Sequence, residues 1–344
     1  MGACISIMAK KIRNVYDKYL TYDNLMKAHN KSKQGKGYKK SVILFNLKKE
    51  EYISWLYEAL KTGTYRHGGY KVFYITEPKL RKIEASNYID RIVHRWYVES
   101  FLGGFINQFI YNSYACLKDK GMHIAAKDVQ KAMQTCKRKY EQYYILKMDI
   151  AHYFQNIDKN ILLNILKRKI EDPKVWWLTK QIINSKKEDK GIPIGNYTSQ
   201  IYANIYLNEL DQYIKHNLKV KYYFRYMDDS IILLKNKDEL KEILKKIRSF
   251  LNEKLKLELN TKTNIFKGSQ GVNFCGYKIN EYRLKIRTKG KKKLKRKIKY
   301  LKYKIKQGEM TSKEAKKYLC GHIGYIDMAN TYNLINRNFY EEIL

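Results

Sequence analysis

The sequence predicts an α+β fold whose sheet has split βαβ connectivity. Three observations predict it: an apolar strand over 143–150, a strand–turn–strand pattern over 221–235, and helical stripes between and after them. From 141 to 280 the order is strand, helix, helix, hairpin, helix and strand, which gives a sheet with one face covered by helices. A basic segment over 282–307 has 14 Lys or Arg and apolar residues at helical spacing, and predicts a final helix.

The segment before this sheet is predicted to be mostly helical. Residues 10–62 indicate helices separated by the basic stretch NKSKQGKGYKKS, for which we favour a solvated loop. Residues 71–76, KVFYIT, have the composition of a strand. Pro78 then marks a turn.

Within the sheet region each remaining element has its own signal. Residues 158–170 have a helical pattern, and the Gly- and Pro-containing turn at 191–200 leads into another helix. Residues 240–255 carry a continuous apolar stripe at helical spacing. Strand patterns return at 255–259 and 272–279.

The charge balance indicates a polyanionic partner. The 344 residues carry a formal net charge of +37, and aromatic residues make up 14% of the chain, too many for a disordered polymer. Nucleic acid is the first expectation and an acidic membrane surface the second. No apolar run is long enough to span a membrane, so we expect no membrane partner.

The cysteines and the N-terminus bear on the compartment. Five scattered cysteines show no zinc-binding spacing and suit a reducing, cytoplasmic environment in a bacterial, archaeal or phage-infected cell. The apolar stretch at the N-terminus is short for a signal peptide. Gly2 and Ser6 fit the short myristoylation pattern, for which we favour a chance match.

Three acidic residues are the candidate catalytic centre. Asp149 ends a buried strand, and Asp228 and Asp229 lie at the tip of the predicted hairpin. In the split βαβ order these strands are neighbours, so the carboxylates are expected at one sheet edge. Clustered carboxylates repel one another unless cations bind, and two Mg²⁺ ions would serve nucleotidyl transfer. The alternative is ordinary turn chemistry at Asp-Asp.

These motifs resemble a known enzyme family over essentially the whole chain. YMDD (226–229) after KMDIAHYF (147–154) resembles the palm of reverse transcriptases, which are RNA-directed DNA polymerases with a right-hand fold. The resemblance implies N-terminal helices and fingers over 1–140. It implies a palm over 141–280, of which 155–197 is partly fingers-like, and a basic helical thumb over 281–344.

A narrower resemblance concerns the biology. IGNYTSQ (194–200) resembles the corresponding block of reverse transcriptases from diversity-generating retroelements. This implies cDNA synthesis from a retroelement template RNA, with mutagenesis directed at adenines for target-gene diversification. The alternatives are a retron, group II intron or phage-defence reverse transcriptase. An alternative of another class is a non-catalytic RNA-binding protein on a polymerase fold.

The resemblance assigns roles at the catalytic centre. It implies that Asp149, Asp228 and Asp229 are catalytic and hold two Mg²⁺ ions, for which Mn²⁺ is a possible substitute. The carbonyl of Ile150 is implied as an additional metal ligand. Leu117 departs from the family, in which arginine is usual, so we assign no template contact there.

Further roles concern the incoming nucleotide. The resemblance implies that Lys79 and Arg81 hold the triphosphate, and that the ring of Phe154 excludes a ribose 2′-hydroxyl. Ile194 and Gly195 would form the floor of the deoxynucleotide pocket. The alternative for Lys79 and Arg81 is a solvated turn, and that for Phe154 is a core position.

The last set of roles concerns the leaving group and the primer. Lys262 aligns with a lysine that protonates pyrophosphate, although Lys267 lies close in sequence. Phe274, Cys275 and Gly276 match the primer grip. The implied partners are template RNA, a DNA or RNA primer, cDNA, deoxynucleotides and a small basic accessory protein of the retroelement.

Overall fold

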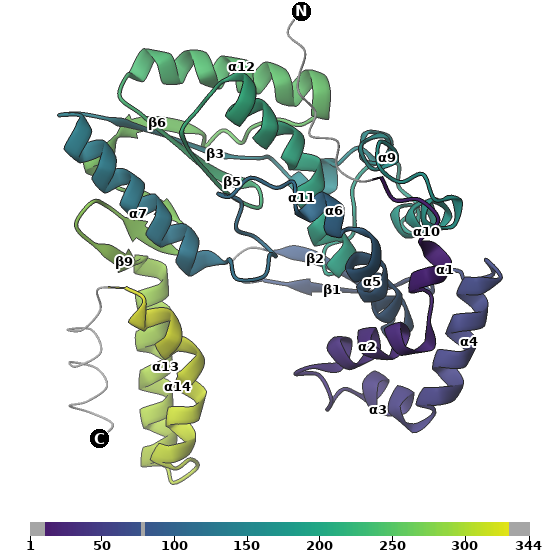
Figure 1. The fold of residues 1–344 in the computed structure, drawn as a ribbon. Helices are drawn as coiled ribbons and strands as arrows, with labels where there is room; N and C mark the ends of the chain where they lie inside the picture. Colours follow the sequence, from purple (N-terminus) through teal and green to yellow (C-terminus); the bar gives the residue numbers. More distant parts are fainter. Residues whose placement is uncertain (1–10, 77–79, 330–344) are drawn as a thin grey trace, which may run out of the picture. The chain divides into compact units, whose positions relative to one another are not determined.

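The computed structural model describes residues 11–76 and 80–329, and it confirms the predicted α+β class (Figure 1). The chain divides into two compact units. Unit 1 comprises Met1–Ile110, Ala151–Tyr213 and Ser249–Glu258, and unit 2 comprises Tyr111–Ile150, Ile214–Arg248 and Leu259–Leu344. The division into fingers, palm and thumb stays a prediction.

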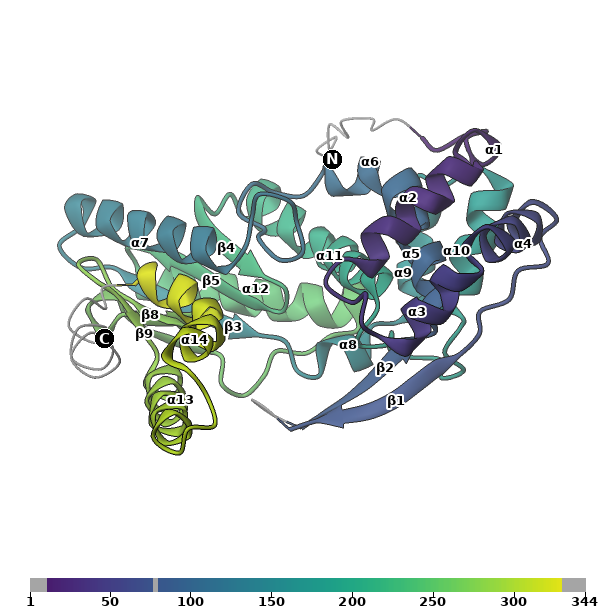
Figure 2. The same cartoon turned by 90° about the horizontal axis from the view of Figure 1, so that it is seen from below.

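Unit 1 is mainly helical and has one two-stranded sheet. Its elements are α1 (Tyr16–Tyr19), α2 (Tyr22–Lys33), α3 (Lys40–Leu47), α4 (Lys49–Lys61), β1 (Tyr70–Ile75), β2 (Arg81–Ser86), α5 (Tyr88–Phe101), α6 (Gly103–Ile106), α8 (Tyr153–Asn156), α9 (Lys159–Lys167), α10 (Pro173–Ile183) and α11 (Tyr197–Gln212). The strands form an antiparallel ladder from Tyr70 opposite Ser86 to Ile75 opposite Arg81, seen along its length in Figure 2.

Side-chain caps fix the beginnings of two helices in unit 1. The Asp158 carboxylate accepts a hydrogen bond from the backbone N–H of Ile161 and begins α9. Asp172 caps α10, and Pro173 occupies the first turn, where its missing N–H has no helical partner to lose. The Asp158 cap explains why the predicted helix over 158–170 begins where it does, and the helix ends at Lys167.

Unit 2 contains the sheet that the split βαβ pattern predicts. Its elements are α7 (Met122–Lys139), β3 (Tyr144–Asp149), β4 (Tyr222–Tyr226), β5 (Asp229–Leu234), β6 (Asn264–Lys267), β7 (Val272–Phe274), β8 (Tyr277–Ile279), β9 (Leu284–Ile286), α13 (Thr288–Lys306) and α14 (Ser312–Asp327), and α12 (Lys237–Leu255) has residues in both units. The antiparallel order β4-β5-β3-β6 places β3 beside the hairpin strand β5, as predicted.

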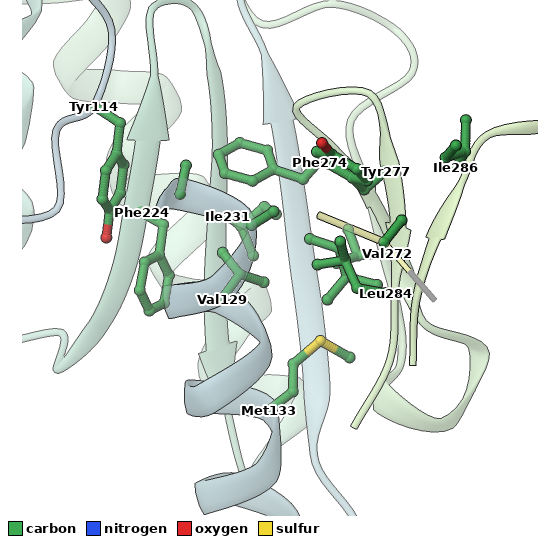
Figure 3. Packing of buried hydrophobic residues seen from close by; sticks show 14 of the residues in the cluster. Tyr114, Val129, Met133, Phe224, Ile231, Val272, Phe274, Tyr277, Leu284 and Ile286 are labelled. Carbon is green, nitrogen blue, oxygen red and sulfur yellow. The ribbon is translucent and has the colours of Figure 1, made fainter. Parts of the chain in front are cut away.

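One apolar cluster supports both sheets of unit 2. Val129 and Met133 of α7 belong to the same buried cluster as Ile231 of β5 and Leu284 of β9 (Figure 3). The basic helix α13 also joins this cluster, through Leu294 and its other buried apolar residues. Figure 1 shows α14 alongside α13. A lysine-rich helix is therefore anchored by one apolar stripe while its remaining faces stay basic.

Three local predictions were wrong in detail. The strand predicted at 255–259 does not form, because α12 continues to Leu255 and Leu259 makes a single bridge to Ile150. The strand predicted at 272–279 is a hairpin, β7 and β8. The basic stretch predicted as a loop begins inside α2, which ends at Lys33. None of the helices in the described part of the chain has the length and apolar character that a bilayer crossing requires.

Candidate active site

The three predicted acidic residues meet at one end of the four-stranded sheet. Asp149, the last residue of β3, pairs across the strands with Asp229, the first residue of β5. Asp228 precedes it in the two-residue turn between β4 and β5, in which Met227 has φ +57°. Two-residue hairpin turns need such a φ at their first central position, although it strains a residue other than glycine. The register thus brings together acids that lie about 80 residues apart in the chain.

The electrostatics of this cluster depend on burial and mutual repulsion. Burial is the main cause that raises the pKa of Asp229 to about 6, and the charges of Asp149 and Asp228 act in the same direction. The ammonium of Lys147 acts against them. Within the described ranges, no three His, Cys, Asp or Glu side chains are already arranged to hold one metal ion.

Lys147 is the residue at this site that the sequence analysis missed. Its Nζ donates to Oδ1 and to Oδ2 of Asp229, both at 2.9 Å, and to the carbonyl oxygen of Asn273 at 2.6 Å. A signal was present in the sequence. Alternation places Lys147 on the same face of the strand as Asp149, and a cation in an otherwise apolar strand needs an anionic partner.

The backbone after β3 is free to offer an oxygen. Ile150 forms an isolated antiparallel bridge with Leu259, and the neighbouring Asp149 carbonyl accepts the N–H of Asn260 at 2.7 Å. Among the described residues, no hydrogen bond to the Ile150 carbonyl is found. Its predicted use as a metal ligand therefore requires no backbone bond to be broken.

The predicted primer-grip residues form the turn between β7 and β8. Cys275 (φ +48°) and Gly276 (φ +84°) are the two central residues, the pattern of a type I′ turn. Phe274 is 1% exposed, and the Lys147 ammonium lies 5.8 Å from its ring centroid. Burial raises the pKa of the Cys275 thiol, and the charge of Asp229 adds to this effect. The turn therefore lies within electrostatic range of the acidic cluster.

The two candidate lysines, Lys262 and Lys267, lie near opposite ends of β3. Lys262 follows Asn260, the residue bonded to the Asp149 carbonyl, and its N–H donates to the Asn260 side chain at 3.0 Å. Lys267 pairs with Tyr144 at the opposite end of β3. The structure therefore favours Lys262 as the lysine near the acidic cluster.

In unit 1, strand β2 fixes the predicted floor of the nucleotide pocket. The Ile194 carbonyl accepts the N–H of Glu84 at 2.9 Å. Asn196 Oδ1 accepts from the N–H of Ser86 at 3.2 Å and from its hydroxyl at 2.6 Å. Gly195, between these anchors, has φ +124°, a conformation in which side chains are strained.

Two more predicted nucleotide-binding residues lie in the same unit. Phe154 is half-buried in α8, and its carbonyl accepts the N–H of Ile192 at 2.9 Å, two residues before the pocket floor. Its ring packs edge-on against Tyr153 at 5.6 Å between centroids. Arg81 is exposed at the beginning of β2, and Lys79 lies outside the described residues.

Comparison with known proteins identifies the family. Residues 75–279, more than half of the chain, match the family described as reverse transcriptase (RNA-dependent DNA polymerase). This chain belongs to the reverse transcriptase family. The match contains β3, the hairpin with Asp228 and the β7–β8 turn, and the predicted right-hand polymerase class is confirmed by it.

Individual relatives of this reverse transcriptase are distant. The chain is 25% identical to the group II intron-encoded protein LtrA of Lactococcus lactis over 307 residues, which cover 67% of this chain and 50% of LtrA. It is 25% identical to protein YkfC of Escherichia coli over 242 residues, 58% of this chain and 63% of YkfC. The chain thus spans between half and two thirds of the length of these relatives.

Solved telomerase structures show weak similarity. That of Candida tropicalis has a TM-score of 0.49 at 15% identity, covering 63% of this chain and 47% of that one. That of Candida albicans, in complex with a telomeric RNA fragment, has a TM-score of 0.48 at 12% identity, covering 71% and 50%.

Proposed function

We propose that this chain synthesises DNA on an RNA template by two-metal nucleotidyl transfer. One observation carries the proposal: the β3–β5 register sets Asp149 against Asp229, with Asp228 in the adjoining turn, in a chain of the reverse transcriptase family. Like charges placed directly opposite in a ladder are destabilising, and the single ammonium of Lys147 faces three acids, so this arrangement favours a cationic ligand.

The donor set at this site suits a hard divalent cation. Asp149 and Asp228 contribute carboxylate oxygens, and the Ile150 carbonyl is oriented by the Leu259 bridge. Oxygen donors of this kind are those that Mg²⁺ and Mn²⁺ prefer. Two bound Mg²⁺ ions would supply the Lewis acidity that activates a primer 3′-hydroxyl and stabilises the leaving pyrophosphate. Asp229, held by Lys147, would set the charge and position of the other two acids.

The remaining assignments concern substrate selection. We assign the triphosphate to Lys79 and Arg81, the deoxyribose to Phe154, and the base and sugar to Ile194 and Gly195. Support comes from β2, which carries Arg81 and fixes the pocket floor by hydrogen bonds. A rigid pocket floor favours selection of the deoxyribose by shape, because a floor that moved could also accept a ribose.

Primer positioning is assigned to the β7–β8 turn. Phe274, Cys275 and Gly276 would position the primer 3′ end, and Lys262 would donate a proton to pyrophosphate. The bond from Lys147 to the Asn273 carbonyl supports this assignment, because one ammonium connects the turn to an acid of the catalytic cluster.

The biological subclass has two candidates. The IGNYTSQ block favours a diversity-generating retroelement, with a dedicated template RNA and a small basic accessory protein. Similarity to LtrA favours a group II intron enzyme instead. Sequencing cDNA made from a defined template distinguishes them: substitutions concentrated opposite adenines support the first, and uniform copying supports the second.

The central test is extension of a DNA primer on an RNA template with Mg²⁺. Asp228→Ala should abolish extension while RNA binding persists. Asp238→Ala, an exposed aspartate of α12 paired with Lys241, is the matched control and should extend normally. If the wild-type chain binds RNA and extends no primer under any template or metal condition, the non-catalytic reading replaces the polymerase.

Sugar selection gives a sharper test of the pocket. Phe154→Ala should raise the incorporation of ribonucleotides relative to deoxynucleotides, because the ring that excludes the 2′-hydroxyl is gone. Phe154→Tyr, which keeps the ring, should retain discrimination. Unchanged discrimination in the alanine variant would remove the gate role and leave the polymerase assignment standing.

A further inference from the structure

Unit 1 contains a second pocket formed by residues outside the set assigned above. Its volume is about 400 Å³, within the range typical of small-ligand sites. The lining residues come from the chain before β1 and from the end of α10, and they are Arg66, His67, Trp177, Lys180, Gln181, Asn184 and Ser185. We refer to this site as the Trp177 pocket.

One helix face supplies most of the chemistry of the pocket. Trp177, Lys180, Gln181 and Asn184 follow the i, i+3, i+4, i+7 spacing, so they lie on one side of α10 and of its C-terminal end. The buried residues of α10, such as Leu178, face the opposite way. This face therefore presents an indole, an ammonium and two amides together.

The polar side chains of this helix face make no bond to the rest of the described chain. In the part of the chain that the structure describes, no ion pair forms to Lys180 or Arg66, and no side-chain hydrogen bond forms to Gln181 or Asn184. The Arg66 Nη1 is anchored on the carbonyls of Gly63 and Tyr65, at 3.1 and 2.9 Å. The other guanidinium donors of Arg66 are left for a ligand.

The wall opposite the helix is rigid. Asp90 accepts the Tyr65 hydroxyl at 2.6 Å and the N–H of Gly68 at 3.1 Å, which fixes the segment around His67. The His67 ring stacks against His94 at 5.3 Å between centroids. A ligand would therefore meet a preformed surface and would not have to order it.

His67 contributes its ring to this wall. Its Nδ1 accepts the N–H of Gly69 at 3.0 Å, so the neutral ring carries its proton on Nε2. Nε2 is buried and has no hydrogen-bond partner among the described residues. Burial lowers the pKa of His67, which favours the neutral form of the ring. Because Nε2 is buried behind the wall, it offers no hydrogen bond to a ligand in the pocket, and the polar chemistry of the pocket comes from the other lining residues.

We propose that the Trp177 pocket binds an unpaired nucleotide of single-stranded RNA. The indole would stack on the base, and the amides of Gln181 and Asn184 would meet its edge with both donors and acceptors. Arg66 and Lys180 would hold the flanking phosphates. An acidic peptide would use the two cations and leave the indole and the amides without a purpose.

This inference rests on the proposed function, because an RNA template supplies the unpaired strand. The pocket would then anchor template RNA through residues other than the acids, the β7–β8 turn and the 194–196 segment. A nucleotide within a duplex is excluded, since its base faces are already stacked. The same chemistry would suit a free mononucleotide, and the experiment separates these two sources.

The test measures binding of a 12-nucleotide single-stranded RNA to the full chain at fixed salt, without primer or deoxynucleotides. Trp177→Ala should weaken binding about ten-fold. Trp176→Ala is the matched control: it is the adjacent tryptophan, lies 4.9 Å from the Lys167 ammonium and does not line the pocket, so binding should stay within two-fold. RNA containing 5-iodouridine should crosslink to Trp177.

Each other outcome overturns the assignment. Equal RNA binding by the two tryptophan variants, whether reduced or unchanged, would show that Trp177 has no particular role and that the indole does not stack on a base. If AMP competes as strongly as the unlabelled strand, the pocket binds a free nucleotide. If the wild type binds poly-glutamate more tightly than Trp177→Ala does, the pocket binds a peptide. The double variant of Gln181→Ala and Asn184→Ala repeats the test if Trp177→Ala misfolds. Since no step needs catalysis, failure here leaves the polymerase proposal intact.

Discussion

Lys147 is predicted to act as the resident counter-charge of the acidic cluster. Lys147→Met keeps most of the side-chain volume and removes the ammonium that contacts both oxygens of Asp229 and the Asn273 carbonyl. Asp229 would then stand beside Asp149 and Asp228 without a cation. Because Lys147 opposes the rise in the pKa of Asp229, its loss should raise that pKa further.

The size of the expected loss of stability follows from the exposure of the Lys147 and Asp229 side chains. The side chains of Lys147 and Asp229 are 27% and 30% exposed, between a surface pair and a buried one. Surface pairs contribute up to about 1 kcal/mol, and breaking a fully buried pair costs about 3–5 kcal/mol. We therefore expect Lys147→Met to lower the free energy of unfolding by about 2 kcal/mol in the absence of divalent cations.

The assay is urea unfolding with EDTA and with saturating Mg²⁺. A cation bound at the carboxylate cluster replaces the lost ammonium, so Mg²⁺ should stabilise Lys147→Met more than the wild type. Lys285→Met, which removes an exposed lysine of β9, controls for the change in net charge. The reasoning is refuted if Lys147→Met and Lys285→Met unfold alike in EDTA, or if Mg²⁺ stabilises all three proteins equally.

Three further predictions concern other parts of the chain. Burial lowers the pKa of His94 to about 3, below its ordinary 6.5, so stability is intact above pH 6.5 and falls as the unfolded state takes up a proton in acid. The free energy of unfolding should be roughly 2 kcal/mol lower at pH 5 than at pH 7.5. His94→Gln should reduce this pH dependence, and an equal pH dependence in wild type and variant would contradict the assignment to His94. Gly195→Ala should destabilise by about 1–3 kcal/mol in urea unfolding, because φ is +124° and the new methyl lies 3.0 Å from a β2 side chain, whereas Gly37→Ala, in open space, should be neutral. Lys262→Ala should slow single-turnover extension and flatten its pH profile, with Lys267→Ala as control; the reverse order would make Lys267 the proton donor.

The sequence by itself determined the fold class and the acids. Strand and helix periods are local properties, so the order of elements predicted that β3 and the hairpin are neighbours, and hence that Asp149 and Asp228 converge. Local patterns also misled. The alternating pattern at 255–259 predicted a strand, but α12 extends to Leu255. Of the residues that follow, Leu259 forms a single bridge, to Ile150. Gly276 was the available signal that 272–279 would turn back on itself.

Tertiary structure alone decided which partners these residues meet. Lys147 is one lysine among many in the sequence, and only the packing of β3 between β5 and β6 places its ammonium on Asp229 and Asn273. Likewise, the helical spacing of Trp177 and its neighbours could be seen in the sequence. The facing wall at His67 could not, because it comes from a distant segment that Asp90 holds in place. The physical reason is that periodicity fixes the direction of a side chain relative to its own element, whereas charge pairing and pocket formation depend on long-range contacts between elements.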